Sequence, residues 1–284
     1  MWNFFSPVDG HWYLWNLDGA GIAVCGRSAG AATRWEARVE RADLAGLEAA
    51  CRSHETATSF AACDEGEREP PLEGDPLLRV VPGQGRVALQ AALPSLPVSF
   101  RLEAPLMLLP GASCSLDWEV PAGFMLVRED GLEIFSFYPY VVPQTWNGDA
   151  VQGELCIDMD GHIALSGSKA DHGADSLPGA DSLPGADSLI HGRVVVTNRL
   201  RVPLELDRLV VHTDSLGLWR AGSRLFADEL HADGIAGESG LRMIPRPAAE
   251  SLSGAAVAVA KPRLGQGDQL VRRSMGFIRS LTNL

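Results

Sequence analysis

A Gly-x-Ser-x-Gly pattern at residues 26–30 is the segment whose residue types suggest the most familiar chemistry. In α/β-hydrolases this pattern places a nucleophilic serine between a strand and a helix, with an acidic residue and a histidine later in the chain. Ser28 would be that serine, with Asp207 and either His212 or His231 as partners. However, only 27 residues precede Ser28, and the residues after it alternate like a strand. A hydrolase whose site is assembled from distant strands is therefore our alternative function, and we assign no catalytic residue.

The histidines and cysteines form no local metal-binding motif. No two histidines are two, three or four positions apart, and there is no Cys-x-x-Cys pair. His191, His212 and His231 could still meet through neighbouring strands. The five cysteines are odd in number and widely spaced, which argues against a disulfide framework. We predict no metal and no cofactor, and we expect thiols in apolar runs to pack as small hydrophobic groups: Cys25, Cys114 and Cys156.

Two further polar patterns have simple structural interpretations. The segment Pro-Gly-Gln-Gly-Arg at residues 82–86 lacks the strand and helix context of a phosphate-binding loop, so we predict a hairpin turn. The acidic pairs Asp158/Asp160 and Glu205/Asp207 have the spacing of residues on one face of a strand. Spacing along one strand does not establish the two-carboxylate geometry of a glycosidase, so we expect solvated faces.

The one positive indication of function is an aromatic, proline-punctuated stretch at residues 139–147, which we predict to be a loop. Tyr138, Tyr140 and Trp146 would form a surface for a small molecule or a protein partner, because aromatic residues are enriched at interfaces. This stretch favours a non-catalytic binding or protein-interaction module over an enzyme.

Composition excludes several classes of protein. The net charge of −12 argues against general nucleic-acid binding, and the basic cluster Arg272, Arg273 and Arg279 fits a solvated helix face better. No apolar stretch of about 18 residues is present, so we expect no membrane span. The first residues do not have the pattern of a signal peptide, and we expect a cytoplasmic location. The excess of arginine over lysine suggests a bacterial source.

Period-two alternation of apolar residues is the main structural signal in the chain. In residues 192–219 it predicts two antiparallel strands joined by a turn between Asn198 and Pro203, with a third strand beginning at Leu218. Residues 1–40 predict a three-stranded meander with a turn at Asp18 and Gly19.

Short apolar runs separated by glycine and proline turns continue this pattern through most of the chain. They lie at residues 77–81, 86–92, 98–103, 114–120, 124–127, 132–137, 154–157, 162–165, 224–230, 241–244 and 255–259. The runs on either side of Asp160 and Gly161 predict a hairpin. We therefore predict an all-β, mainly antiparallel β-sandwich, either one sandwich or two sandwich-like halves.

Three segments interrupt this β pattern. Helical spacing predicts a short helix at residues 43–52 and an amphipathic C-terminal helix at residues 268–281. Three tandem hexapeptides, Gly-Ala-Asp-Ser-Leu followed by Pro or Ile, occupy residues 173–190. We expect a surface insertion; the alternative is a calcium loop of Asp175, Asp181 and Asp187. These features divide the chain into a β-rich region at 1–168, a repeat loop at 169–190 and a β-rich region with a helix at 191–284.

The order of four strand-rich segments resembles the domain of unknown function family 432. These segments are PLLRVVP, SFRLEAPLMLLPGASCSLDWEVPAGFMLV, GLEIFSFYPYVVPQTWNGDAVQGELC and GRVVVTNRLRVPLELDRLVVHTDSLGLW. They cover about half of the chain and are strand patterns, not catalytic signatures. The resemblance implies a β-rich fold without an assigned activity, and it transfers no site residues.

Overall fold

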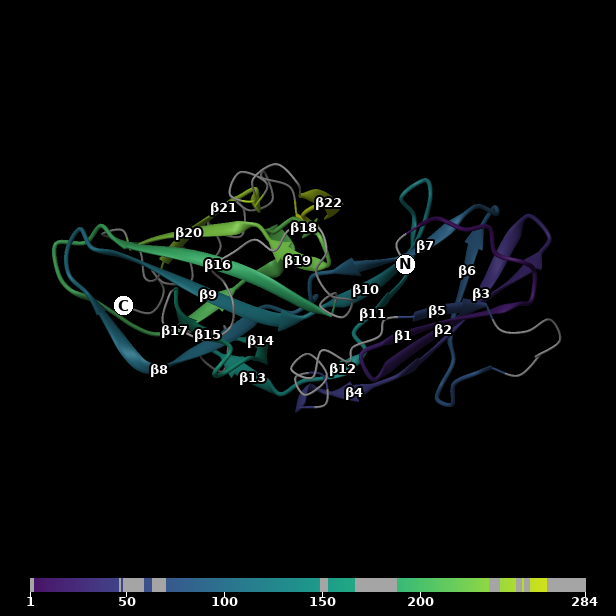
Figure 1. The fold of residues 1–284 in the computed structure, drawn as a ribbon, viewed down its shortest axis with the longest axis horizontal. Helices are drawn as coiled ribbons and strands as arrows, with labels where there is room; N and C mark the ends of the chain where they lie inside the picture. The colour runs from purple at the N-terminus through teal and green to yellow at the C-terminus, as the bar shows by residue number, and fades with distance from the viewer. Residues whose placement is uncertain are drawn as a thin grey trace. The chain divides into compact units, whose positions relative to one another are not determined.

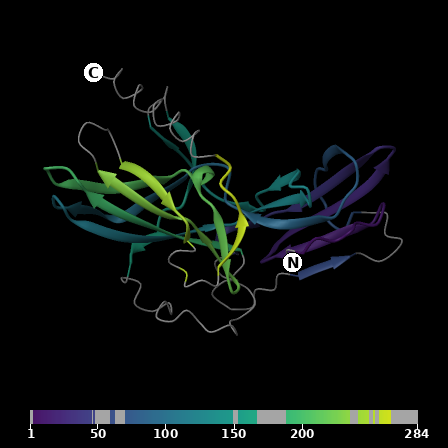
Figure 2. The same ribbon diagram turned by 90° about the horizontal axis from the view of Figure 1, so that it is seen from above.

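The structure, a computed structural model, describes residues 3–45, 47, 59–62, 70–148, 153–166, 188–234, 241–248, 252 and 256–264. In both views the coloured ribbon consists of strands joined by loops (Figure 1, Figure 2). Its helical content is three α-helical residues at 44, 45 and 47, the 3-10 turn Thr213–Ser215 and a further 3-10 residue, Ala248. The prediction of an all-β, mainly antiparallel sandwich fold is confirmed. In the described part of the chain, no helix is long and apolar enough to cross a membrane.

Contacts divide the chain into two compact units. Unit 1 consists of Met1–Ala92, Pro121–Val142 and Leu183–Ser188, and unit 2 consists of Leu93–Val120, Pro143–Ser182 and Leu189–Leu284. Each unit therefore takes strands from separate stretches of sequence. The predicted regions 1–168, 169–190 and 191–284 are consecutive stretches of the chain, whereas each unit combines separate stretches. The division into these regions therefore stays a prediction.

The larger sheet of unit 1 has five strands in the order β5-β1-β2-β3-β6. Their bounds are Ser59–Ala62, Trp12–Leu17, Ala20–Ala29, Ala32–Glu40 and Leu77–Pro82. Strands β1, β2 and β3 form the predicted meander. Asp18 and Gly19 have φ angles of 50° and 89°, the left-handed conformation that a two-residue hairpin turn of matching twist requires.

A three-stranded sheet, in the order β11-β10-β7, is the second main sheet of unit 1. Its strands are Glu133–Phe137, Gly123–Arg128 and Val87–Ala92, and a short parallel pair joins β4 (Ala42–Asp43) to β12 (Tyr140–Val141). The largest fully buried side chains of the unit come from both main sheets, and they include Trp12, Trp15, Leu89, Phe124 and Ile134. Burial of these apolar groups is the main stabilising contribution to the unit.

Unit 2 also contains two sheets. One has four strands in the order β13-β14-β8-β17, with bounds Gln144–Asn147, Glu154–Asp158, Val98–Leu108 and Leu204–Val211. The other has eight strands and follows the order β15-β9-β16-β19-β18-β22, with bounds Ile163–Leu165, Ser113–Pro121, Leu189–Asn198, Arg224–Ala227, Leu218–Ala221 and Val257–Ala260. Strand β20 (Glu229–Gly234) also pairs with β16, and β21 (Leu241–Arg246) pairs with β20.

The predicted hairpin between residues 192 and 211 is wrong in its pairing, although both strands exist. Strand β16 lies in the eight-stranded sheet, whereas β17 pairs with β8 in the four-stranded sheet. The buried side chain of Asn198 holds the turn between them: its Nδ2 donates to the carbonyls of Leu108 (2.8 Å) and Val202 (2.9 Å), and its Oδ1 accepts from the amide of Leu200. The turn therefore carries the chain from one sheet to the other.

Two more predicted hairpins are wrong for the same reason. The strands on either side of Asp160 and Gly161 exist, but β14 pairs with β13 and β8, and β15 pairs with β9. The turn at residues 82–86 joins β6, which pairs with β3, to β7, which pairs with β10. The predicted loop at 139–147 is wrong in part, because Tyr140–Val141 between its two prolines form β12, and Gln144–Asn147 after the second proline form β13. These residues keep the N–H groups that pairing requires.

Several predicted segments lie wholly or partly outside the described residues. These are the C-terminal helix at 268–281 with its three arginines, the hexapeptides up to residue 187 and most of the helix at 43–52, of which Leu44, Ala45 and Leu47 are helical. The last repeat runs into β16, because that strand begins at Leu189 and Ile190 is fully buried.

Candidate functional site

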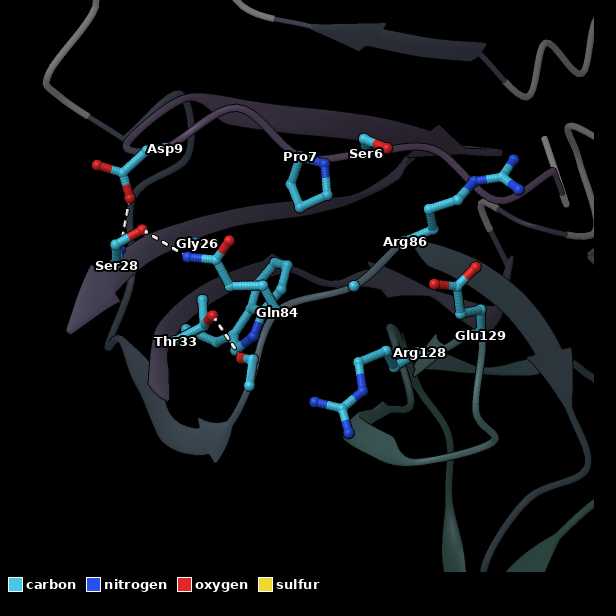
Figure 3. Close-up of a pocket in the computed structure, with 13 residues that line it drawn as sticks. Ser6, Pro7, Asp9, Gly26, Ser28, Thr33, Gln84, Arg86, Arg128 and Glu129 are labelled. Carbon is cyan, nitrogen blue, oxygen red and sulfur yellow. Dashed lines mark hydrogen bonds between the residues drawn. The ribbon is translucent and has the colours of Figure 1, made fainter. Parts of the chain in front are cut away.

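Unit 1 contains a cavity of about 360 Å³ that is lined by five stretches of the chain. Figure 3 shows Asp9 and Ser28 at one end, Arg86, Arg128 and Glu129 at the other, and Gln84 between them. The remaining lining residues are Ser6, Pro7, Gly26, Thr33, Trp35, Gly83 and Gly85. Most of the named side chains are polar, so the cavity offers both hydrogen-bond donors and hydrogen-bond acceptors.

Strand register explains why these segments meet. Ser28 of β2 lies opposite Thr33 of β3, and Thr33 lies opposite Val81 of β6. The loop after β6 therefore begins beside the turn between β2 and β3. Two patterns that looked unrelated in the sequence, Gly-x-Ser-x-Gly and Pro-Gly-Gln-Gly-Arg, thus form adjacent walls of one cavity.

Hydrogen bonds hold these two walls together. The Thr33 Oγ1 donates to the carbonyl of Gly83 (2.9 Å), and the amide of Gly83 donates to the carbonyl of Ala31 (2.8 Å). Gly83 has a φ of 77°, which a side chain would strain. The Gln84 Nε2 then donates to the Ser28 Oγ at 3.2 Å (Figure 3). The position of Gln84 is therefore set by the backbone around it and by Ser28.

The floor of the cavity is the buried ring of Trp35. A Cβ atom at residue 26 would lie 3.2 Å from two atoms of this ring, so glycine leaves space for the indole to lie against the strand. The aliphatic part of the Arg128 side chain packs against Gly85 in the same manner. A Cβ atom at residue 85 would lie only 2.9 Å from Arg128 Cδ. The glycines of both patterns thus permit close packing around the cavity.

Arg128 and Arg86 supply the positive charges of the cavity. Arg128 donates from Nε (2.9 Å) and Nη2 (2.5 Å) to Asp130 and from Nη1 to the carbonyl of Pro82 (2.6 Å). The hydrogen bond from Arg128 lowers the pKa of Asp130 to about 2. Arg86 is exposed and donates from Nη2 to the carbonyl of Phe4 at 2.6 Å. Glu129 at the rim balances part of this charge.

Ser28 does not sit on a nucleophile elbow, so that hypothesis is wrong in its geometry. It lies near the end of β2, and the chain turns at Gly30 and Ala31 straight into β3 instead of a helix. Its amide donates to Asp9 Oδ1, and the hydrogen bonds from Ser28, with the nearby Arg27, lower the pKa of Asp9. A carboxylate with a lowered pKa is a weak base, and no histidine is among the described residues that line the cavity.

The three histidines proposed to meet do not share a site. Each lies beside a different glutamate: His191 Nδ1 is 3.3 Å from Glu119, His212 Nε2 is 3.4 Å from Glu154, and His231 Nε2 is 2.8 Å from Glu229. Within the described ranges, no group of three acidic, histidine or cysteine residues is arranged to hold a metal ion. Asp207, His212 and His231 all belong to unit 2, whereas Ser28 belongs to unit 1.

The aromatic residues of the predicted partner surface divide between the two units. Tyr140 of unit 1 is buried, and its hydroxyl donates to the carbonyl of Leu17 at 3.1 Å. The Tyr138 hydroxyl donates to Pro121 at 3.4 Å, and burial, with a smaller contribution from Tyr140, raises the pKa of Tyr138. Trp146 of unit 2 is 52% exposed. Of the three residues, Trp146 is therefore the one that presents a large aromatic surface to solvent.

One acidic pair and two thiols have structural roles, whereas Glu205 and Asp207 are exposed, as predicted for a solvated face. Asp158 accepts the amide of Asp160, whose carboxylate accepts the amide of Arg101 at 2.9 Å. Burial and the charge of Asp160 raise the pKa of Asp158. Burial also raises the pKa of Cys25 and Cys156 to about 11, so both thiols stay protonated and pack as apolar groups, as predicted.

Comparison with known proteins agrees with the strand-pattern resemblance. Neither a curated protein nor a solved structure matches the chain. Residues 34–279 match the family model described as "Protein of unknown function (DUF432)", which spans both units and most of the chain. The chain therefore belongs to the DUF432 family.

Proposed function

We propose that this protein is a binding module and that the cavity of unit 1 takes a small polar molecule. The observation that carries the proposal is the convergence of polar side chains from five stretches of the chain on one cavity, whose two central walls are held together by hydrogen bonds. Ligand sites typically combine a preformed concave shape with a few fixed polar groups.

The size and charge of the cavity define the class of ligand. A volume of about 360 Å³ is at the lower end of the range for ligand cavities, which suits a molecule of the size of an amino acid or a monosaccharide. Gln84 and the two arginines can donate hydrogen bonds, while Glu129 and Asp9 can accept them. A compound that carries both an anionic group and hydrogen-bond donors matches this arrangement.

Binding is favoured over hydrolysis because the groups needed to activate Ser28 are not assembled around it. Its hydroxyl accepts from Gln84, an amide donor that cannot remove a proton. The free thiols of Cys25, Cys114 and Cys156 support a reducing compartment such as the cytoplasm as the place where this binding occurs. The exposed Trp146 supports a separate contact with a partner protein.

A thermal-shift screen with amino acids, short dicarboxylates and monosaccharides tests the proposal. A ligand at about one hundred times its Kd adds about 2.7 kcal/mol of stability, which raises the Tm by roughly 5 °C. We expect a compound with an anionic group to give such a shift. The double variant Gln84→Leu and Arg86→Met should lose the shift, because it removes two donors and keeps the side-chain bulk.

The matched control is Gln144→Leu, which changes an exposed glutamine in unit 2. This variant should bind as the wild type does. If no compound of the panel shifts the wild-type protein, or if the shift survives in the double variant, the cavity is not the binding site.

A further inference from the structure

We infer that Asp18 and Ser188 form a proton-dependent latch, a contact that holds the chain where it leaves unit 1 while the Asp18 carboxyl is protonated and releases it when the carboxyl ionises. This contact is separate from the polar cavity, and the inference does not depend on the proposed ligand. It rests on where the two side chains lie, on their burial and on the groups that surround them.

The hairpin turn between β1 and β2 fixes the position of Asp18. Leu17 of β1 pairs with Ala20 of β2, and Asp18 between them has the left-handed φ of 50°. The Tyr140 hydroxyl donates to the carbonyl of Leu17 at 3.1 Å, which attaches the turn to β12. The carboxyl of Asp18 therefore starts from a backbone that is held on two sides.

Ser188 lies at the point where the chain leaves unit 1. It is the last residue of unit 1 in this part of the sequence, and Leu189 begins β16 of unit 2. Its carbonyl accepts from the amide of Ala122 at 2.9 Å, one residue after Pro121, where the chain enters unit 1. A contact that holds Ser188 therefore acts beside two of the places where the chain passes between the units.

Both side chains are buried, and each is short of hydrogen-bond partners. Asp18 is only 4% exposed and Ser188 is fully buried. The Ser188 hydroxyl lies beside the Asp18 carboxyl, and its interaction with this carboxyl partly offsets the rise in pKa that burial causes. Beyond this contact, neither group has a hydrogen-bond partner among the described residues. A buried carboxylate with one donor is costly, whereas a neutral carboxyl can donate to the Ser188 oxygen.

The groups around the turn leave burial as the main influence on Asp18. On the elements packed beside it, the hydroxyls of Tyr138 and Tyr140 are neutral and donate to backbone carbonyls. Three charged residues between the end of β3 and β4 are exposed to solvent: Glu40, Arg41 and Asp43. Because burial raises the pKa of Asp18, the contact is complete in acid and is lost as the pH rises through the raised value.

The test is hydrogen–deuterium exchange of the full chain, read by mass spectrometry in the peptide Leu189–Asn198. The wild type is compared with Asp18→Asn at the same pH, so the intrinsic exchange rate of this peptide is equal in both. At about pH 8 the wild-type peptide should exchange at least about threefold faster, because asparagine stays a neutral donor to Ser188. At about pH 4 the two proteins should exchange alike, because Asp18 is then protonated.

Two further variants assign the effect to this pair of side chains. Ser188→Ala removes the acceptor, so the peptide should exchange fast at both pH values, and Asp18→Asn should no longer slow it in this background. The matched control is Asp75→Asn, since Asp75 is an exposed aspartate of unit 1, and its exchange should equal that of the wild type.

Three results would overturn the inference. One is equal exchange of wild type and Asp18→Asn at about pH 8, and another is a difference between them that persists in the Ser188→Ala background. The third is an equal slowing of exchange by Asp18→Asn in β16 and in β10, because the substitution would then raise global stability without a local contact.

Discussion

The indole ring of Trp118 in β9 lies directly against the backbone of Gly192 in β16. A Cβ atom at residue 192 would come within 2.0 Å of Trp118 Cζ2, which is closer than any real contact of such atoms. Trp118 is almost completely buried, so its ring has no free space to move into. The absence of a side chain at residue 192 is therefore what allows this tryptophan to fill the core between two neighbouring strands of unit 2.

Gly192→Ala should lower the free energy of unfolding by about 3 kcal/mol or more, because the added methyl group forces the ring or the strand to shift. Urea unfolding followed by circular dichroism measures this change. In a double-mutant cycle, the same substitution should cost less in a Trp118→Leu background, where the smaller side chain leaves room. Equal costs in the two backgrounds would show that the contact with Trp118 is not the cause.

Asp228 accepts three hydrogen bonds that tie separate parts of unit 2 together. Its carboxylate accepts from Trp219 Nε1 (2.6 Å), from the amide of Gly217 (2.7 Å) and from the amide of Ala248 (3.2 Å). Asp228→Ala should cost about 3 kcal/mol, since it leaves buried donors without acceptors. Asp207→Ala is the control, because that carboxylate is exposed, and it should change stability by less than about 0.5 kcal/mol.

Asp18 and Asp130 should give opposite pH dependences of stability. Burial raises the pKa of Asp18, so the folded protein binds its proton more tightly than the unfolded chain does. The stability that Asp18 contributes is complete below its ordinary pKa of 3.8 and is lost as the pH rises through the raised folded value. Asp18→Asn should therefore remove this loss and stabilise the protein at pH 7, and asparagine also tolerates the φ of 50°.

For Asp130 the sign is reversed, because the bond from Arg128 lowers its pKa to about 2. Its contribution is complete above a pH of about 4 and is lost as the pH falls toward 2. Asp130→Asn should reduce the stability of the protein at pH 7. It should also weaken the dependence of stability on pH between about pH 4 and pH 2. Chemical unfolding of the wild-type protein and of both variants between pH 2 and pH 7 tests these two predictions. The stability difference between wild type and variant should change with pH in opposite directions for Asp18→Asn and Asp130→Asn. A change in the same direction for both would contradict the predictions.

Ser28 should not react as an activated serine. A fluorophosphonate probe should label neither the wild-type protein nor Ser28→Ala, since the carboxylate beside Ser28, Asp9, has a lowered pKa and is a weak base, and no histidine is among the described residues that line the cavity. Labelling is read by intact-protein mass spectrometry, with a known serine hydrolase as the positive control for the probe. A phosphonylated Ser28 in the wild type that is lost in Ser28→Ala would restore the hydrolase hypothesis.

Local patterns in the sequence determined which segments become strands. The runs that correspond to β6 through β11 follow from alternation of apolar residues, and the hairpin between β1 and β2 follows from the turn residues Asp18 and Gly19. The apolar environments of Cys25 and Cys156 follow from the same patterns. Each of these features depends on residues within one strand or one turn, which is why the sequence alone is informative about them.

Tertiary structure decided which strands pair and which polar groups meet. A turn such as Asn198–Pro203 or residues 82–86 looks the same in sequence whether it joins two paired strands or carries the chain from one sheet to another. Which of the two occurs depends on strands far away in the sequence, as when β17 pairs with β8. The cavity depends on this choice, because Ser28 and Gln84 are 56 positions apart and meet only when β3 pairs with both β2 and β6. Register is a property of long-range contacts, so the site became visible only in the folded protein.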